Sequence, residues 1–89
     1  MTTMFVRHNV TDYAAWKTAY EGFDSKRKAL GVTAQASYQS ATDPTDVTVT
    51  HNFSSIDAAR AFASSPELKD AMQKAGVVGE PSIWFANQN

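Results

Sequence analysis

The stretch TMFVRHNVTDYAAWKTAYEGFDSKRKAL, residues 3–30, decides the fold because its hydrophobic period changes from two to about 3.6 partway along. The alternation of β-forming residues from Thr3 to Val10 predicts a strand. Beyond it, large side chains recur at spacings of three and four, so we expect one helix that stops at Gly31. The residues on its common face are Tyr13, Trp16, Tyr20, Phe23, Arg27 and Leu30.

This helix face carries two phenols, an indole and a guanidinium, where a purely structural face would consist of Leu, Ile and Val. Such groups fill space but need polar partners when they are buried. The face suits the wall of a small pocket for a flat organic molecule. It equally suits an ordinary core whose polar tips reach water, and the sequence leaves both interpretations open.

The rest of the chain has the pattern of two strands, a broken helix and a last strand. The break falls at Ser65, which can cap a new helix whose first residue is Pro66. In the second strand we expect Ala34, Ala36 and Tyr38 to face the helices. The expected segments are a strand over Val32–Gln39, a turn over 41–46, a strand over Val47–Phe53, a helix over Ser55–Ala63 continued from Pro66 to Gly76, a connector over Gly79–Pro81 and a strand over Ser82–Ala86.

The element order β-α-β-β-α-β predicts one ferredoxin-like α+β sandwich domain over residues 1–89. We expect a four-stranded antiparallel sheet in the order 4-1-3-2, with both helices on one face. Phe5, Gln35 and Trp84 fall on the other face, where two large aromatic side chains would leave an exposed apolar patch. A homodimer with its two sheets face to face would cover this patch, and we expect that assembly.

Composition excludes several classes of protein. The 89 residues contain no Cys, which removes thiol catalysis and thiolate metal sites. The net charge is −1 and no basic stripe exists, so nucleic acid is not an expected partner. No signal peptide is evident and no apolar stretch approaches the roughly 20 residues that cross a bilayer, so we expect a cytoplasmic protein with no membrane partner. A Gly-rich phosphate loop is missing too, and we expect no tightly bound cofactor.

One candidate site pairs Arg27 with His51, because the topology brings the end of the first helix to the end of the third strand. A neighbouring cation disfavours the imidazolium form, which leaves His51 able to accept a proton near pH 7. His51 could then deprotonate a phenol or enol while Arg27 stabilises the resulting oxyanion. Alternatively, Arg27 forms a salt bridge with Asp24 or Glu21, and His51 lies at the rim.

A competing polar cluster at the opposite end joins His8 to Tyr13 and Trp16. His8 and His51 share a sheet face but lie more than about 10 Å apart at about 3.4 Å per residue, too far to hold one metal ion. We therefore expect no metal site. The expected walls of a substrate pocket are Trp16, Tyr20 and Phe23.

Several motifs along nearly the whole chain carry a family resemblance. They are Phe5-Val6-Arg7-His8, Val10-Thr11-Asp12-Tyr13-Ala14-Ala15-Trp16, Asp43-Pro44, Ala58-Ala59-Arg60-Ala61-Phe62, Ser64-Ser65-Pro66-Glu67-Leu68 and Gly76-Val77-Val78-Gly79. With them the sequence resembles the dimeric α+β barrel superfamily. Within it the resemblance is to the small proteins grouped with antibiotic-biosynthesis monooxygenases and often labelled cyclases.

The resemblance implies oxidation of polyketide or quinol-like aromatics by dioxygen after substrate deprotonation, without metal or flavin. Relatives on the same scaffold cyclise polyketides or degrade haem. The monooxygenases often place an acid before the aromatic that ends the third strand, and a His in the second helix. This chain has Asn52 and Phe62 at those places, so no catalytic residue is carried over from the family.

Three hypotheses about function follow. The first is a cofactor-independent monooxygenase or cyclase-like enzyme acting on an aromatic or polyketide-like small molecule, with His51 as base and Arg27 as oxyanion stabiliser. The second is a non-catalytic homodimer that binds a small hydrophobic ligand. The third is a haem-handling protein with His8 or His51 as the axial ligand.

Overall fold

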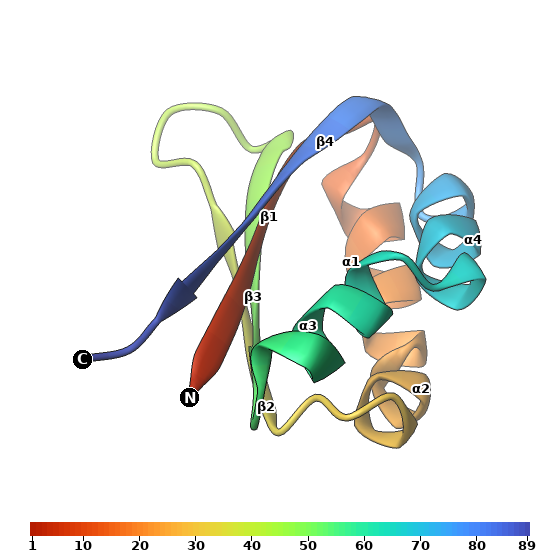
Figure 1. Cartoon of the computed structure of the whole chain (residues 1–89). Helices are drawn as coiled ribbons and strands as arrows, with labels where there is room; N and C mark the ends of the chain where they lie inside the picture. The colour runs from red at the N-terminus through yellow and green to blue at the C-terminus, as the bar shows by residue number, and fades with distance from the viewer.

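A computed structural model describes all of residues 1–89 and has two layers, a twisted sheet and a set of helices that covers one face of it (Figure 1). All strand pairs are antiparallel and their order is β2-β3-β1-β4, which is the expected 4-1-3-2 order counted from the other edge. The α+β architecture is therefore confirmed. The elements are β1 (Thr2–Val10), α1 (Tyr13–Gly22), α2 (Asp24–Ala29), β2 (Ala34–Gln39), β3 (Asp46–Phe53), α3 (Ile56–Ala63), α4 (Pro66–Lys74) and β4 (Val77–Asn87).

The first helix is divided, and the expectation of one continuous helix up to Gly31 was wrong. Phe23 separates α1 from α2 with φ −87° and ψ −2°, and its N–H donates to the carbonyls of Ala19 and Tyr20. Gly22 just before it is a poor helix former, which weakens the helix at this point. Across this break, the guanidinium of Arg27 in α2 lies over the ring of Tyr20 in α1.

Strand β2 faces the opposite way from the sequence prediction. Its Ser37 pairs with Val49, and its Gln35 pairs with His51, so these two polar residues face the helices. Gln35 donates from Nε2 to Oδ1 of Asp24 at 2.6 Å, whereas Tyr38 is 58% exposed on the open face. Val32 is buried, but it lies in the turn after α2 and not in the strand. Counting alternate residues from Val32 therefore assigned the wrong face of β2 to the core.

Strand β4 is longer than expected and contains a bulge. Arg7 pairs with Ser82 and Asn9 with Val78, so Gly79–Pro81 oppose His8 alone. The prediction treated these residues as a connector outside the sheet. They form a bulge because Gly79 has a φ of 72° and because proline has no N–H to donate to the ladder.

The core lies between the helices and the sheet. The most deeply buried apolar side chains are Met4, Val6, Val47, Phe53, Ala59 and Phe62. Four buried polar side chains share this layer: Thr2, His8, Arg27 and His51. On the open face, the rings of Phe5 and Trp84 stack at 5.3 Å between centroids, and Trp84 is 44% exposed. None of the helices has the length and apolar character needed to span a membrane.

Candidate functional site

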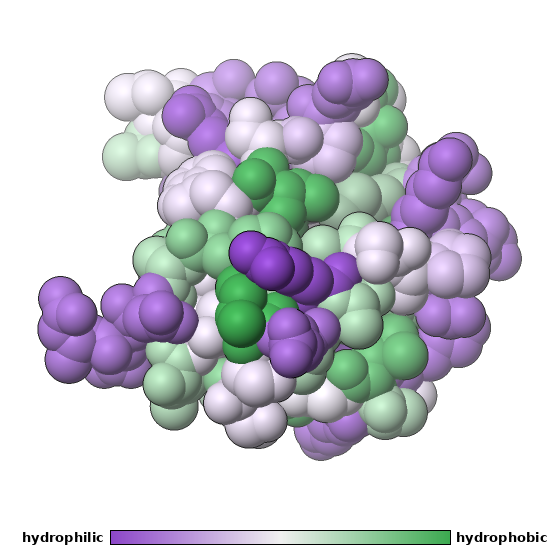
Figure 2. Space-filling model, viewed as in Figure 1, coloured by the Kyte–Doolittle hydropathy of each residue, from purple (hydrophilic) through white to green (hydrophobic).

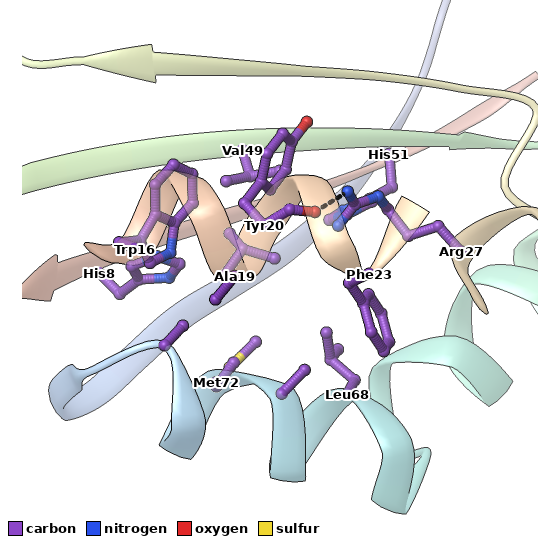
Figure 3. A pocket seen from close by; sticks show the side chains of 13 residues that line it. His8, Trp16, Ala19, Tyr20, Phe23, Arg27, Val49, His51, Leu68 and Met72 are labelled. Atoms are coloured by element: carbon purple, nitrogen blue, oxygen red, sulfur yellow. Dashed lines mark hydrogen bonds between the residues drawn. The ribbon is translucent and has the colours of Figure 1, made fainter. Parts of the chain in front are cut away.

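A small cavity of about 50 Å³ lies between the sheet, the α1–α2 helices and α4. Figure 3 shows His8 and Trp16 at one end, Arg27 and His51 at the other, and Leu68 and Met72 projecting from α4 across from them. Its lining is mostly apolar. The thirteen lining residues are Val6, His8, Trp16, Ala19, Tyr20, Phe23, Arg27, Val49, His51, Leu68, Ala71, Met72 and Ala75.

Only 3% of Arg27 is exposed. Its buried guanidinium has no carboxylate partner. Its Nη2 donates to the backbone carbonyl of Tyr20, its guanidinium lies 4.1 Å from the centroid of the Tyr20 ring, and its Nε has no partner. Burial lowers the pKa of Arg27, while Tyr20 and Asp24 act against this shift. An arginine nevertheless keeps its proton at neutral pH. The cavity wall therefore carries a positive charge that no ion pair balances.

The alternative salt bridge predicted for Arg27 does not form. Asp24 pairs instead with Nζ of Lys28 at 3.2 Å and accepts the hydrogen bond from Gln35. These two contacts hold the Asp24 carboxylate between Lys28 of α2 and Gln35 of β2. They leave the guanidinium of Arg27 to the cavity.

His51, on β3, is 4% exposed, and its ring centroid lies 5.0 Å from that of Phe62. Its Nδ1 is buried without a hydrogen-bond partner. Burial, followed by the charge of Arg27, lowers the pKa of His51 to about 4. The imidazole is therefore neutral at physiological pH and has a free nitrogen lone pair or N–H to offer a ligand.

His8, on β1, lies opposite the bulge in β4, and neither of its ring nitrogens has a hydrogen-bond partner. Burial lowers its pKa, and the charge of Asp46 acts in the opposite direction. The ring of His8 is 5.8 Å from Trp16, which in turn stacks on Tyr20 at 4.9 Å. Aromatic rings therefore connect the two polar ends.

The structure brings together residues that the sequence sorted into two separate clusters. His51 pairs with Met4, and His8 lies four residues further along β1, so the imidazoles are well separated, yet both line one cavity with Arg27. Tyr13 does not line it and instead packs on Trp16 at 5.8 Å. The α4 wall was not predicted, although the spacing of Leu68 and Met72 by four residues is a signal for one helix face.

The size and chemistry of the cavity limit what it can hold in this conformation. About 50 Å³ accommodates a few water molecules and is smaller than the roughly 150 Å³ of a cavity that admits benzene. No group of three or more His, Cys, Asp or Glu side chains is arranged to hold a metal ion. A haem, far larger than benzene, does not fit beside His8 or His51 without rebuilding the core.

Comparisons with known proteins place the fold. No protein-family model matches the sequence, and no curated protein matches it either. Three solved structures similar to this chain are proposed or established oxygenases by their descriptions. The proposed antibiotic biosynthesis monooxygenase of Bordetella bronchiseptica superimposes with a TM-score of 0.86 at 12% identity, over 99% of this chain and 96% of that one.

The other two structures agree with the first. The proposed antibiotic biosynthesis monooxygenase of Nitrosomonas europaea has a TM-score of 0.77 at 16% identity, covering 99% of this chain and 98% of its own. SnoaB, a cofactor-independent oxygenase from Streptomyces nogalater, has a TM-score of 0.76 at 14% identity, covering 99% and 94%. The chain therefore has the fold of the antibiotic-biosynthesis-monooxygenase-like proteins, as the sequence motifs indicated.

Proposed function

We propose that this protein is an enzyme that removes a proton from a phenolic or enolisable aromatic compound, and that it works as a cofactor-independent monooxygenase or as a cyclase-like enzyme. One observation carries the proposal. A buried neutral imidazole and a buried guanidinium without a counter-ion, His51 and Arg27, line the same cavity. A base beside an anion-stabilising cation is what deprotonation of a carbon or oxygen acid requires.

In this mechanism His51 accepts the proton, and Arg27 stabilises the phenolate or enolate that forms. The charge of Arg27 contributes to the low pKa of His51 in the free protein. The developing anion offsets that charge, so the imidazole becomes a stronger base as the proton is transferred. Trp16, Tyr20 and Phe23 supply flat apolar surface on which an aromatic substrate stacks.

The fate of the anion decides between the two reactions. In an oxygenase it reacts with dioxygen, so that a ring methylene becomes a carbonyl and the second oxygen atom leaves as water. In a cyclase the same carbanion attacks a carbonyl of the same molecule. SnoaB, which shares the fold, is described as a cofactor-independent oxygenase, and this favours the first reaction.

Anthrone is a suitable probe, because it enolises and its oxidation to anthraquinone is followed by absorbance. We expect oxygen-dependent turnover by the wild-type protein and a loss of at least about 100-fold in His51→Gln and in Arg27→Met, the size typical of a lost base or oxyanion partner. Arg60→Ala, at an exposed position on α3, is the matched control and should keep full activity.

Exchange of the anthrone methylene protons in D₂O without oxygen separates deprotonation from oxidation. Exchange that depends on His51, with no oxygen consumption in air, would assign the cyclase-like reaction. If His51→Gln and Arg27→Met exchange and oxidise anthrone as fast as the wild-type protein, the proposed site is wrong.

The second candidate is a non-catalytic homodimer that binds a small hydrophobic ligand. The mostly apolar lining of the cavity favours it, because ten of the thirteen lining residues are hydrophobic. In that case, anthrone binding would be retained in His51→Gln and turnover would be missing in every variant. The homodimer itself belongs to both candidates and is supported by the stacked Phe5 and Trp84 on the open face.

A further inference from the structure

A larger groove lies next to the cavity, between α4 and the bulged part of β4. Its volume is about 540 Å³, within the range of about 300–1,000 Å³ that is usual for small-molecule sites. Figure 2 shows hydrophobic atoms exposed between β4 and the helices on this side of the molecule. The lining residues are Ala63, Ser64, Ser65, Pro66, Leu68, Lys69, Met72, Gln73, Val77, Gly79, Glu80, Pro81 and Ile83.

Two side chains, Leu68 and Met72, line both the groove and the cavity. They form a partition, one residue thick, between the inner polar groups and the outer surface. Leu68 is 7% exposed and packs in the core, whereas Met72 is only partly buried. A methionine has three flexible torsions and no branch at Cβ, so its side chain is the part of the partition that moves at least cost.

The groove has a chemical character of its own. Leu68 and Met72 at the partition and Val77 and Ile83 on β4 give the groove its apolar surface, whereas Lys69, Gln73 and Glu80 are exposed on the rim. Buried polar groups without partners, found in the cavity, have no equivalent in the groove. The groove therefore suits an apolar chain or ring, and the cavity suits a compact polar head.

We propose that the groove holds an apolar extension of the substrate while its phenol or enol head lies at Arg27 and His51, with Met72 swinging aside to connect the two. This rests on the head site of the proposed function and defines the substrate class as phenols or enols with an alkyl chain or further ring. It also reconciles the 50 Å³ cavity with an aromatic substrate, since displacing Met72 joins the cavity to the groove.

A series of para-alkylphenols with lengthening chains tests the proposal by calorimetric titration. Each added methylene should tighten binding about fourfold, equivalent to about 0.8 kcal/mol, until the groove is filled. Arg27→Met should weaken every member of the series by the same factor and leave this increment unchanged, because the tail does not contact Arg27. An affinity that is independent of chain length in the wild-type protein would overturn the proposal.

Substitutions of Met72 test the partition. Met72→Trp should close the connection and abolish the chain-length increment, whereas Met72→Leu, of similar volume, should keep it. Met72→Ala, which cannot block the passage, should also keep the increment and should speed association. An increment retained in a folded Met72→Trp would overturn the proposal.

Two further outcomes separate this inference from its alternatives. A gain in affinity per methylene that depends on Met72, with no turnover of any phenol or of anthrone, would support the groove as a binding site and reject the proposed enzyme. Turnover of anthrone without any gain in affinity per added methylene would support the proposed enzyme and overturn the groove as the site of the substrate's extension. Alkylphenol binding that weakens as the protein concentration rises would assign the groove to a second copy of the chain and overturn the proposal.

Discussion

At the scale of single residues, Arg27 stands out as a charged side chain that is buried without an ion pair. Its charge is buried against the rings of Tyr20 and Phe23, with one backbone carbonyl as its hydrogen-bond acceptor. Desolvating a charge without a partner of opposite sign costs several kcal/mol, which the interactions of the remaining core must offset. A charge held in this way implies that stability is given up for binding or catalysis.

Replacing Arg27 by methionine tests whether its buried charge lowers the stability of the fold. We expect Arg27→Met to raise the free energy of unfolding by about 1–3 kcal/mol, because an apolar chain of similar length replaces an uncompensated charge. Urea denaturation of the two proteins measures the difference. A loss of stability larger than about 1 kcal/mol would mean that the charge is compensated in a way that the geometry does not account for.

The pKa of His51 predicts how stability depends on pH. It is about 4 in the folded protein, whereas an unfolded histidine titrates near about 6.5. Between these values the unfolded chain binds more protons, so the free energy of unfolding rises with pH through this window. We expect a loss of order 3 kcal/mol as pH falls from 6.5 to 4, and a smaller loss in His51→Gln. If the free energy of unfolding depends on pH equally in the wild-type protein and in His51→Gln, the lowered pKa of a buried His51 is contradicted.

At the scale of elements, hydrophobic period and capping were enough to predict the order of strands and helices. The buried face of strand β2 was predicted wrongly because Val32 lies before the strand and the alanines carry too little apolar area to decide between the two faces. The break at Phe23 and the bulge at Gly79–Pro81 were not predicted, because Gly22, Gly79 and Pro81 weaken a helix or a ladder without showing where the backbone changes. Topology was enough to expect His51 and Arg27 at the same end of the first helix and third strand, whereas the α4 wall of the cavity depends on how that helix packs.

Two glycines with positive φ provide a test of local structure. Gly76 has a φ of 81°, and a Cβ added there would lie 2.8 Å from Oγ1 of Thr11, whereas Gly79 has a φ of 72° and open space around it. Alanine at either site costs about 1–2 kcal/mol for the left-handed conformation. Gly76→Ala should cost more than Gly79→Ala in urea denaturation. Equal losses would show that the junction before β4 can relax freely.

At the scale of the whole molecule, the open face of the sheet predicts self-association. Phe5, Trp84 and Tyr38 lie on this face, while neighbouring Ile83 lies on the opposite one. We expect Trp84→Lys to shift the protein to monomer in sedimentation equilibrium, because it places a charge in the apolar patch. Ile83→Lys is the control and should leave the dimer intact. A wild-type monomer at micromolar concentration would contradict the prediction.

The most direct test of the central claim, that His51 and Arg27 form one buried acid–base site, is an NMR titration of the His51 ring with and without a bound para-alkylphenol. We predict a pKa near about 4 in the free protein and a clear rise when the phenol binds, because the ligand's anionic form offsets the charge of Arg27. A His51 that titrates near about 6.5 and does not respond to the phenol would contradict the claim.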